Sequence, residues 1–323
     1  MTIIACILIF LLSCFVLVFC AKILIDSLTG IAKYLGWKEF VVAFFTVSLG
    51  SVAPEFFIGI VSAINNVPEL AFGNILGQNI LLLSFTVGLC AIVLKDGIEV
   101  ESKIVRGGAT FTVIGALLPL VLIYDGVLSR ADGIVLLMSF GIFFYWLFSE
   151  KKRFSKIYDD VNEEEKNWGP FFLIKKVSLL LLVFLLVILS AQGIIESSSY
   201  FSSSLGVSIP VIGIIIVAIG VGLPETYFSF ALAKKGQSWM ILGGLMGAIT
   251  MSSTLALGTI SLIRPIVIDM ATIPSFYIAR IFLILCALFF LFFIRTNRRI
   301  STLEGIILVF AYISFIILGI LIR

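Results

Sequence analysis

The feature that most constrains this chain is a series of ten apolar stretches, each long enough to cross a lipid bilayer as a helix. A spanning helix needs about 20 predominantly apolar residues. The stretches cover residues 3–25, 37–64, 70–94, 108–124, 128–149, 171–195, 208–233, 239–263, 271–294 and 304–322. Only 13% of the residues are charged, about half the usual share in a soluble domain. The sequence therefore predicts an all-α integral membrane protein and excludes an ordinary soluble enzyme, a disordered chain and a nucleic-acid-binding protein.

A single hydrophilic linker, residues 150–169, separates a first five-helix unit (1–149) from a second (170–323). Short loops rich in Lys and Arg stay in the cytoplasm. With ten crossings, both termini lie on one side, whose loops and ends hold 3 Lys and Arg residues against 18 on the other side. We expect both termini to lie outside and the linker inside, and the lean loops suit a prokaryotic inner membrane.

The two halves repeat one another when the sequence is shifted by 170 positions without a gap. The matched pairs are Gly50 and Gly220, Pro54 and Pro224, Glu55 and Glu225, Gly73 and Gly243, Gly77 and Gly247, and Gly88 and Gly258. Because each half has an odd number of spans, the second half enters the membrane from the opposite side. Inverted repeats of this kind are typical of secondary transporters with a binding site near the bilayer midplane.

The matched Glu55 and Glu225 are the only carboxylates in the predicted helix interiors. A charge at that depth costs at least about 2.5–3.5 kcal/mol, so such residues usually serve an ion, a proton or a substrate. Each follows a proline, Pro54 or Pro224, which lacks an N–H and frees the carbonyl four residues earlier. Carboxylates beside free carbonyls suit hard cations. The alternative is a kink with a carboxylate that reaches the surface.

Further oxygen atoms come from amides in the first half and hydroxyls in the second. The third stretch carries Asn74, Gln78 and Asn79 beside glycines that permit close helix packing. The corresponding part of the second half has the hydroxyl residues Thr250, Ser252, Ser253 and Thr254. These amides could instead bond only across helices, and the hydroxyls could bond back to their own helix.

Two further features limit the chemistry. The chain has no His, and its five Cys are scattered in apolar stretches, so we expect no catalytic triad, no zinc site, no resident cofactor and no enzyme activity. Arg280 lies within the ninth stretch and needs an acidic or carbonyl partner there. That partner is either one of the two glutamates or a set of helix-end carbonyls.

The paired motifs resemble those of the sodium/calcium exchanger superfamily, G-[TS]-S-x-P-E followed by G-N-x-x-G-S-N. Residues 50–55 read GSVAPE and residues 73–79 read GNILGQN, while the second half reads GVGLPE at 220–225 and GGLMGAI at 243–249. The resemblance implies a site formed by the second, third, seventh and eighth helices. It assigns Ca²⁺ and Na⁺ binding to Glu55 and Glu225, and a hydroxyl ligand to Ser51.

The sequence also departs from the family pattern. Polar positions of the family are occupied here by Leu82, Ala248, Val221 and Gly222, while Gln78 replaces a serine and Ser252 replaces an Asn or Asp. We therefore expect altered stoichiometry or selectivity, and loss of transport stays open.

The sequence thus predicts a secondary-active antiporter that works by alternating access, with Na⁺/Ca²⁺ exchange as the first hypothesis. An H⁺-coupled or other cation exchanger is the nearest alternative, and a non-transporting sensor or assembly partner of the same fold is another. The candidate metal ligands are Glu55, Glu225, Ser51, Asn79, Gln78 and Ser252. The expected partners are inorganic cations and the lipid bilayer, and the oligomeric state, including a monomer, stays open.

Overall fold

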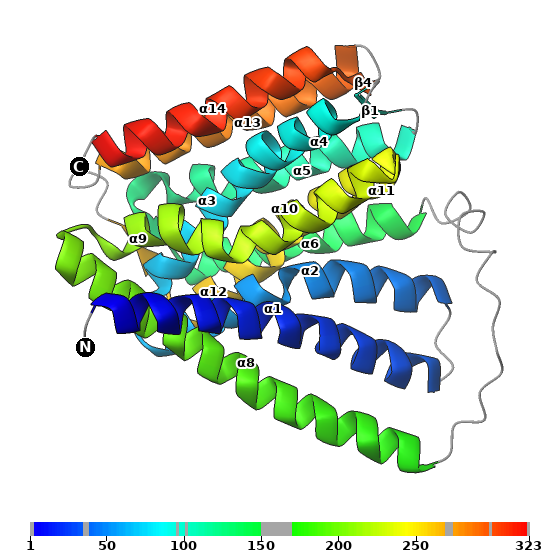
Figure 1. Ribbon diagram of the computed structural model, residues 1–323, viewed down its shortest axis with the longest axis vertical. Helices are drawn as coiled ribbons and strands as arrows, with labels where there is room; N and C mark the ends of the chain where they lie inside the picture. The colour runs from blue at the N-terminus through cyan, green and yellow to red at the C-terminus, as the bar shows by residue number, and fades with distance from the viewer. Residues whose placement is uncertain are drawn as a thin grey trace.

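The fold is a bundle of long helices with both chain ends at the same end of the bundle (Figure 1). The computed structural model describes residues 3–34, 39–94, 97–100, 103–149, 170–268, 274–296 and 299–321. The predicted linker, 150–169, lies outside the described residues. Chain ends on one side agree with an even number of membrane crossings.

The first half contains five helical rods. They are α1 (Ile3–Tyr34), α2 (Glu39–Ile64), the rod formed by α3 (Pro68–Leu81), the π-helical turn η1 (Leu82–Thr86) and α4 (Val87–Val93), then α5 (Lys103–Leu122) with the 3₁₀ turn η2 (Ile123–Asp125), and α6 (Arg130–Ser149).

The second half contains five more. They are α8 (Pro170–Leu205), the rod of α9 (Ile209–Ile212), the π-helical turn η4 (Gly213–Val217) and α10 (Ala218–Lys234), the rod of α11 (Ser238–Met251), the π-helical turn η5 (Ser252–Ala256) and α12 (Leu257–Ile263), then α13 (Pro274–Thr296) and α14 (Thr302–Leu321).

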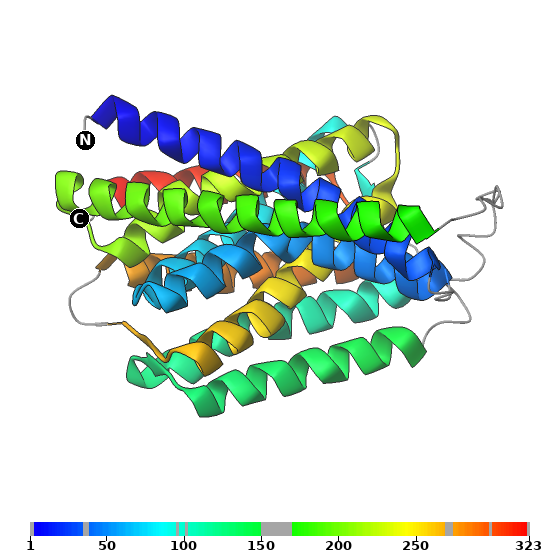
Figure 2. The same ribbon diagram turned by 90° about the horizontal axis from the view of Figure 1, so that it is seen from below.

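These rods confirm the ten predicted stretches in order. In the part of the chain that is described, nine are long and apolar enough to cross a membrane, and Val52–Ile64 is an apolar part of α2. The largest differences from the predicted boundaries are in α1 and α8, which continue to Tyr34 and Leu205. These two helices pack lengthwise against each other on one side of the bundle (Figures 1 and 2).

The inverted repeat is visible in small structural details. The π-helical turns η1 and η5 lie 170 positions apart, as the repeat requires. Two short antiparallel pairings join the halves, β1 (Ile98–Glu99) with β4 (Arg299–Ile300), and β2 (Val127–Leu128) with β3 (Ile266–Val267). Under the shift of 170 positions, β1 falls next to β3 and β2 falls next to β4, so the repeat relates one pairing to the other.

Close helix contacts follow the same symmetry. Helix α14 packs on α4 at Gly88 and Gly305, and α6 packs on α12 at Gly133 and Gly258. A Cβ atom at Gly133 would lie 2.9 Å from the carbonyl oxygen of Gly258, and one at Gly305 would lie 2.8 Å from that of Gly88. Real contacts need more than 3 Å, so glycine allows both crossings.

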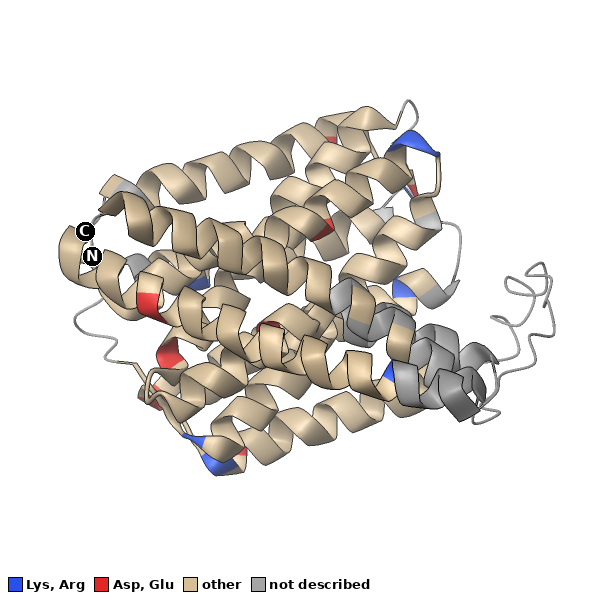
Figure 3. Ribbon diagram, turned by 60° about the horizontal axis from the view of Figure 1, so that its bottom comes forward, with Lys and Arg blue, Asp and Glu red and all other residues tan. Residues whose placement is uncertain are grey.

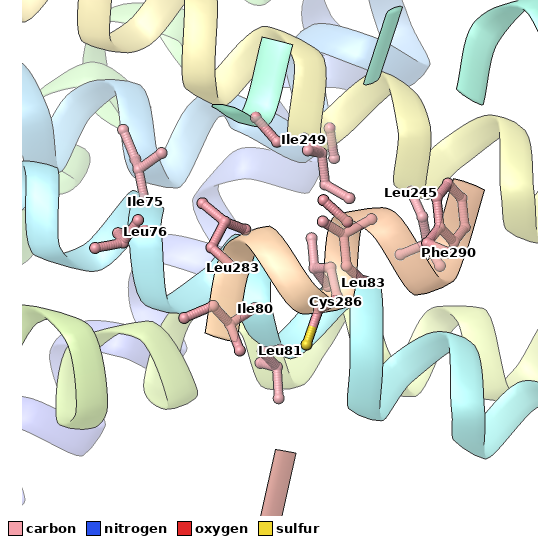
Figure 4. Packing of buried hydrophobic residues seen from close by; sticks show 14 of the residues in the cluster. Ile75, Leu76, Ile80, Leu81, Leu83, Leu245, Ile249, Leu283, Cys286 and Phe290 are labelled. Atoms are coloured by element: carbon pink, nitrogen blue, oxygen red, sulfur yellow. The ribbon is translucent and has the colours of Figure 1, made fainter. Parts of the chain in front are cut away.

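The apolar core lies where α3, α11 and α13 meet. Leu81 and Leu83 of the third rod, Ile249 of α11, and Leu283 and Phe290 of α13 are buried there (Figure 4). Many large apolar side chains of α1, α6, α8 and α14 are instead exposed, as expected for helices that face lipid. The charged residues drawn in colour lie mostly toward the two ends of the bundle (Figure 3).

Candidate cation site

Glu55 of α2 and Glu225 of α10, one from each half, meet at a single amide group. The side-chain nitrogen of Gln78 on α3 donates to Glu55 Oε1 at 2.5 Å and to Glu225 Oε2 at 3.0 Å. Glu55 is 1% exposed and Gln78 is 3% exposed, while Glu225 is partly buried. The structure therefore brings together three of the six predicted ligands.

Glycines on two helices allow this convergence. The α3 backbone lies against the carbonyl oxygens of Pro210 and Ile214, where a Cβ atom at Gly73 or Gly77 would clash. A Cβ atom at Gly222 on α10 would lie 3.4 Å from Cγ of Gln78. The same Cβ atom would lie only 2.6 Å from Cδ2 of Leu81, so the bare backbone at Gly222 permits the close packing of α10 on α3 next to Gln78.

The remaining two described ligands are Asn79, which directly follows Gln78 on α3, and Ser252, the first residue of η5. The Asn79 amide donates to Ser253 Oγ at 2.7 Å, and Ser252 Oγ lies 3.4 Å from Asn79 Oδ1. Ser252 also bonds back to the carbonyl of Ile249, 3.2 Å away. Ser252 therefore both contacts another helix and bonds back to its own helix, the two alternatives that the sequence left open. Ser253 accepts the bond from the Asn79 amide of the first half.

Several buried polar atoms near the two glutamates have no hydrogen-bond partner among the described residues. They are Glu55 Oε2, Gln78 Oε1, and both side-chain heteroatoms of Asn74. Asn74 is fully buried and lies one helical turn before Gln78 on α3. About 90% of buried polar groups in proteins are hydrogen-bonded. Unpartnered buried oxygens of Glu55 and of Gln78, which is bonded to it, are consistent with a ligand at this position.

The other predicted positions fall as follows. The side chain of Ser51 lies outside the described part of the structure. Leu82 and Ala248 are 1% and 4% exposed and belong to the apolar core, so they supply no ligand atoms from their side chains. Arg280 donates to the carbonyl oxygen of Leu120 at 3.2 Å, close to the end of α5. This contact fits the helix-end alternative, since the last carbonyls of a helix attract cations.

One polar contact was missed by the sequence analysis. The hydroxyl groups of Thr86 and Thr226 lie 2.7 Å apart and are buried. Thr226 directly follows Glu225, and Thr86 ends η1. The sequence shows that both threonines lie close to the repeated motifs, which marks them as candidates for the site. Only the packing of α10 on η1 shows that they contact each other.

The set of ligand types limits what the site can bind. Among the described residues, no group of three or more His, Cys, Asp or Glu could hold a metal ion. The site instead combines two carboxylates with amide and hydroxyl groups. Two negative charges formally balance one divalent cation, two monovalent cations or two protons.

Known proteins resemble the chain over nearly its whole length. "Putative antiporter CaxA" of Alkalimonas amylolytica is 27% identical over 300 residues, covering 93% of each chain. "Sodium/calcium exchanger MaX1" of Methanosarcina acetivorans is 25% identical, covering 91% of this chain and 92% of the relative. Structures of the sodium-calcium exchanger NCX_Mj share the fold, with a TM-score of 0.62 at 23% identity over 98% of this chain and 99% of the other.

The family model described as "Sodium/calcium exchanger protein" matches residues 5–149 and 175–321. Its two matched segments correspond to the two halves of the bundle and omit the hydrophilic linker. The match confirms the resemblance found in the repeated motifs. The chain belongs to the sodium/calcium exchanger protein family.

Proposed function

We propose that this protein is a secondary-active antiporter that exchanges Na⁺ for Ca²⁺ across the membrane by alternating access. The observation that carries the proposal is the meeting of Glu55 and Glu225, from two inverted halves, at one buried amide. A site between inverted repeats is open to alternate sides when one repeat moves against the other.

The charge of the site supports exchange rather than independent binding. Two carboxylates provide the charge for one Ca²⁺ or for two Na⁺, so the two ions compete for the same oxygens. Ca²⁺ takes 6–8 oxygen ligands, and Ser51, Asn79 and Ser252 are proposed to supplement the carboxylates. The predicted ligand Gln78 faces them with its side-chain nitrogen instead of its oxygen. The bound cations are cargo, and we propose that the protein holds no resident cofactor.

Two alternatives follow from particular features. An H⁺-coupled or other cation exchanger would use the same carboxylates, one of them taking up a proton during the cycle. The apolar side chains of Leu82 and Ala248 favour a second alternative, a non-transporting protein of this fold that acts as a sensor or assembly partner. In that case Ca²⁺ would bind without gradient-driven transport.

We also propose the orientation. The distribution of Lys and Arg supports both termini outside and the linker inside a prokaryotic cytoplasmic membrane. The relative "Inner membrane protein YrbG" of Escherichia coli, 25% identical over 78% of each chain, supports the choice of membrane.

The test is uptake of ⁴⁵Ca²⁺ into proteoliposomes under an imposed Na⁺ gradient and, separately, under a pH gradient. We expect uptake driven by Na⁺ that is abolished in the double variant Glu55→Gln/Glu225→Gln. Glu196→Gln is the matched control, because Glu196 is exposed on α8. Uptake driven only by the pH gradient would replace Na⁺ with H⁺ as the coupling ion. Absence of uptake under both gradients would refute Ca²⁺ antiport.

A further inference from the structure

The Gln78 amide occupies a special position between the two carboxylates. A primary amide nitrogen carries two N–H donors, and here one is directed to each glutamate, at 2.5 and 3.0 Å. Hydrogen bonds to charged groups are about twice as strong as neutral ones. The amide thus uses all its donors to hold together the two groups expected to bind the cation.

A cation cannot bridge the same two oxygens while the amide stays in place. Ca²⁺ binds oxygen at about 2.3–2.6 Å, so it would need the position beside Glu55 Oε1 and Glu225 Oε2 that the amide nitrogen occupies. The cation would face the positively polarised N–H groups at short range, with no solvent to screen the repulsion, because Gln78 and Glu55 are buried. Binding therefore requires that the amide turn away.

The amide oxygen of Gln78 does not hold the side chain in this orientation. The Oε1 atom is buried and has no hydrogen-bond partner among the described residues, so rotation of the amide breaks no bond at that atom. The contacts to the two carboxylates are the bonds that rotation must break.

We propose that Gln78 is a built-in competitor for the cation and lowers the affinity of the site. In the cation-free state its amide links Glu55 and Glu225, and an arriving cation displaces it. The same two amide bonds must break whichever ion binds, so the competition weakens the binding of Ca²⁺ and of Na⁺ alike. The inference concerns how tightly the site binds a cation. Its meaning for transport rests on the proposed function.

Isothermal titration of the purified protein in detergent with Ca²⁺, and in separate runs with Na⁺, tests the proposal. The variant Gln78→Ser replaces the amide and its two N–H donors with a shorter hydroxyl group, and Gln78→Asn keeps a buried amide but shortens its reach by one methylene. We expect both to bind Ca²⁺ at least about tenfold more tightly, the effect of losing one competing bond of about 1.4 kcal/mol. We expect a similar gain for Na⁺, because the same amide bonds no longer have to break. Gln237→Ser, at the start of α11 where no side-chain capping bond is formed, is the matched control.

A spectroscopic readout separates competition from a general structural effect. Infrared spectra of the cation-free protein report the carboxylate stretch, which we expect to shift in Gln78→Ser and to stay unchanged in Gln237→Ser. Unchanged or weaker binding of both cations by both Gln78 variants would overturn the proposal. Tighter binding by the variants, together with a wild-type protein that transports no Ca²⁺, would support the proposal while refuting the proposed function.

Discussion

Replacing Gly77 with alanine tests whether close packing of α3 builds the site. The added Cβ atom would lie 2.7 Å from the carbonyl carbon of Ile214 and 2.8 Å from Cβ of Ala218. Carbon atoms pack best at about 3.5–4.0 Å, so α3 would have to withdraw from η4 and α10 by about 1 Å. Overpacking typically costs about 1–3 kcal/mol, and because backbone atoms cannot rotate aside, we expect a cost near the upper end. The better helix propensity of alanine offsets up to about 1 kcal/mol.

The matched control is Gly141→Ala on α6, where no atom lies within 4 Å of the added Cβ. SDS-titration unfolding in mixed micelles measures the change in the free energy of unfolding. We expect Gly77→Ala to destabilise by about 1–2 kcal/mol and Gly141→Ala to be neutral or stabilising by up to about 1 kcal/mol. Withdrawal of α3 also lengthens the bond from Gln78 to Glu225, so Ca²⁺ affinity should change only in Gly77→Ala. Equal effects of the two substitutions on stability would refute the reasoning.

Three other predictions follow from the geometry. Asn74→Leu removes a buried amide that has no partners among the described residues. We expect the free energy of unfolding to rise by about 1–3 kcal/mol and Ca²⁺ binding to weaken. A loss of stability would contradict this prediction. Arg280→Leu removes the bond to the carbonyl of Leu120 and should lower the free energy of unfolding by about 1.5–3 kcal/mol; no measurable change would show that the contact does not stabilise the fold. Epitope tags on either terminus should react with antibody on intact cells, and labelling only after permeabilisation would reverse the proposed orientation.

Much of the fold could be predicted because a bilayer allows few solutions. Backbone polar groups in lipid must be satisfied internally, so long apolar stretches form helices. The shift of 170 positions then related the halves, and it placed Glu55 and Glu225 at equivalent depths before any contact was known. The extensions of α1 and α8 were missed because the hydropathy criterion detects the membrane-spanning part, whereas a helix continues through polar residues such as Ser198 and Ser199.

The site was less predictable because it depends on side-chain direction and close packing. The sequence identified Gln78 as a source of oxygen, but the structure directs its nitrogen to the carboxylates. That direction follows from the meeting of α2, α3 and α10, which no single helix encodes. Likewise, Ser253 contacts Asn79 more closely than Ser252 does, because η5 is a π-helical turn and changes which residues face α3.

Equilibrium binding of ⁴⁵Ca²⁺ to Glu55→Gln, to Glu225→Gln and to the double variant tests the central claim most directly. If the two carboxylates hold one cation, each single substitution removes as much bound Ca²⁺ as both together, because residues that act as a unit are not additive. Two independent sites would give the opposite result. Each single variant would then keep its own bound Ca²⁺, and only the double variant would lose both.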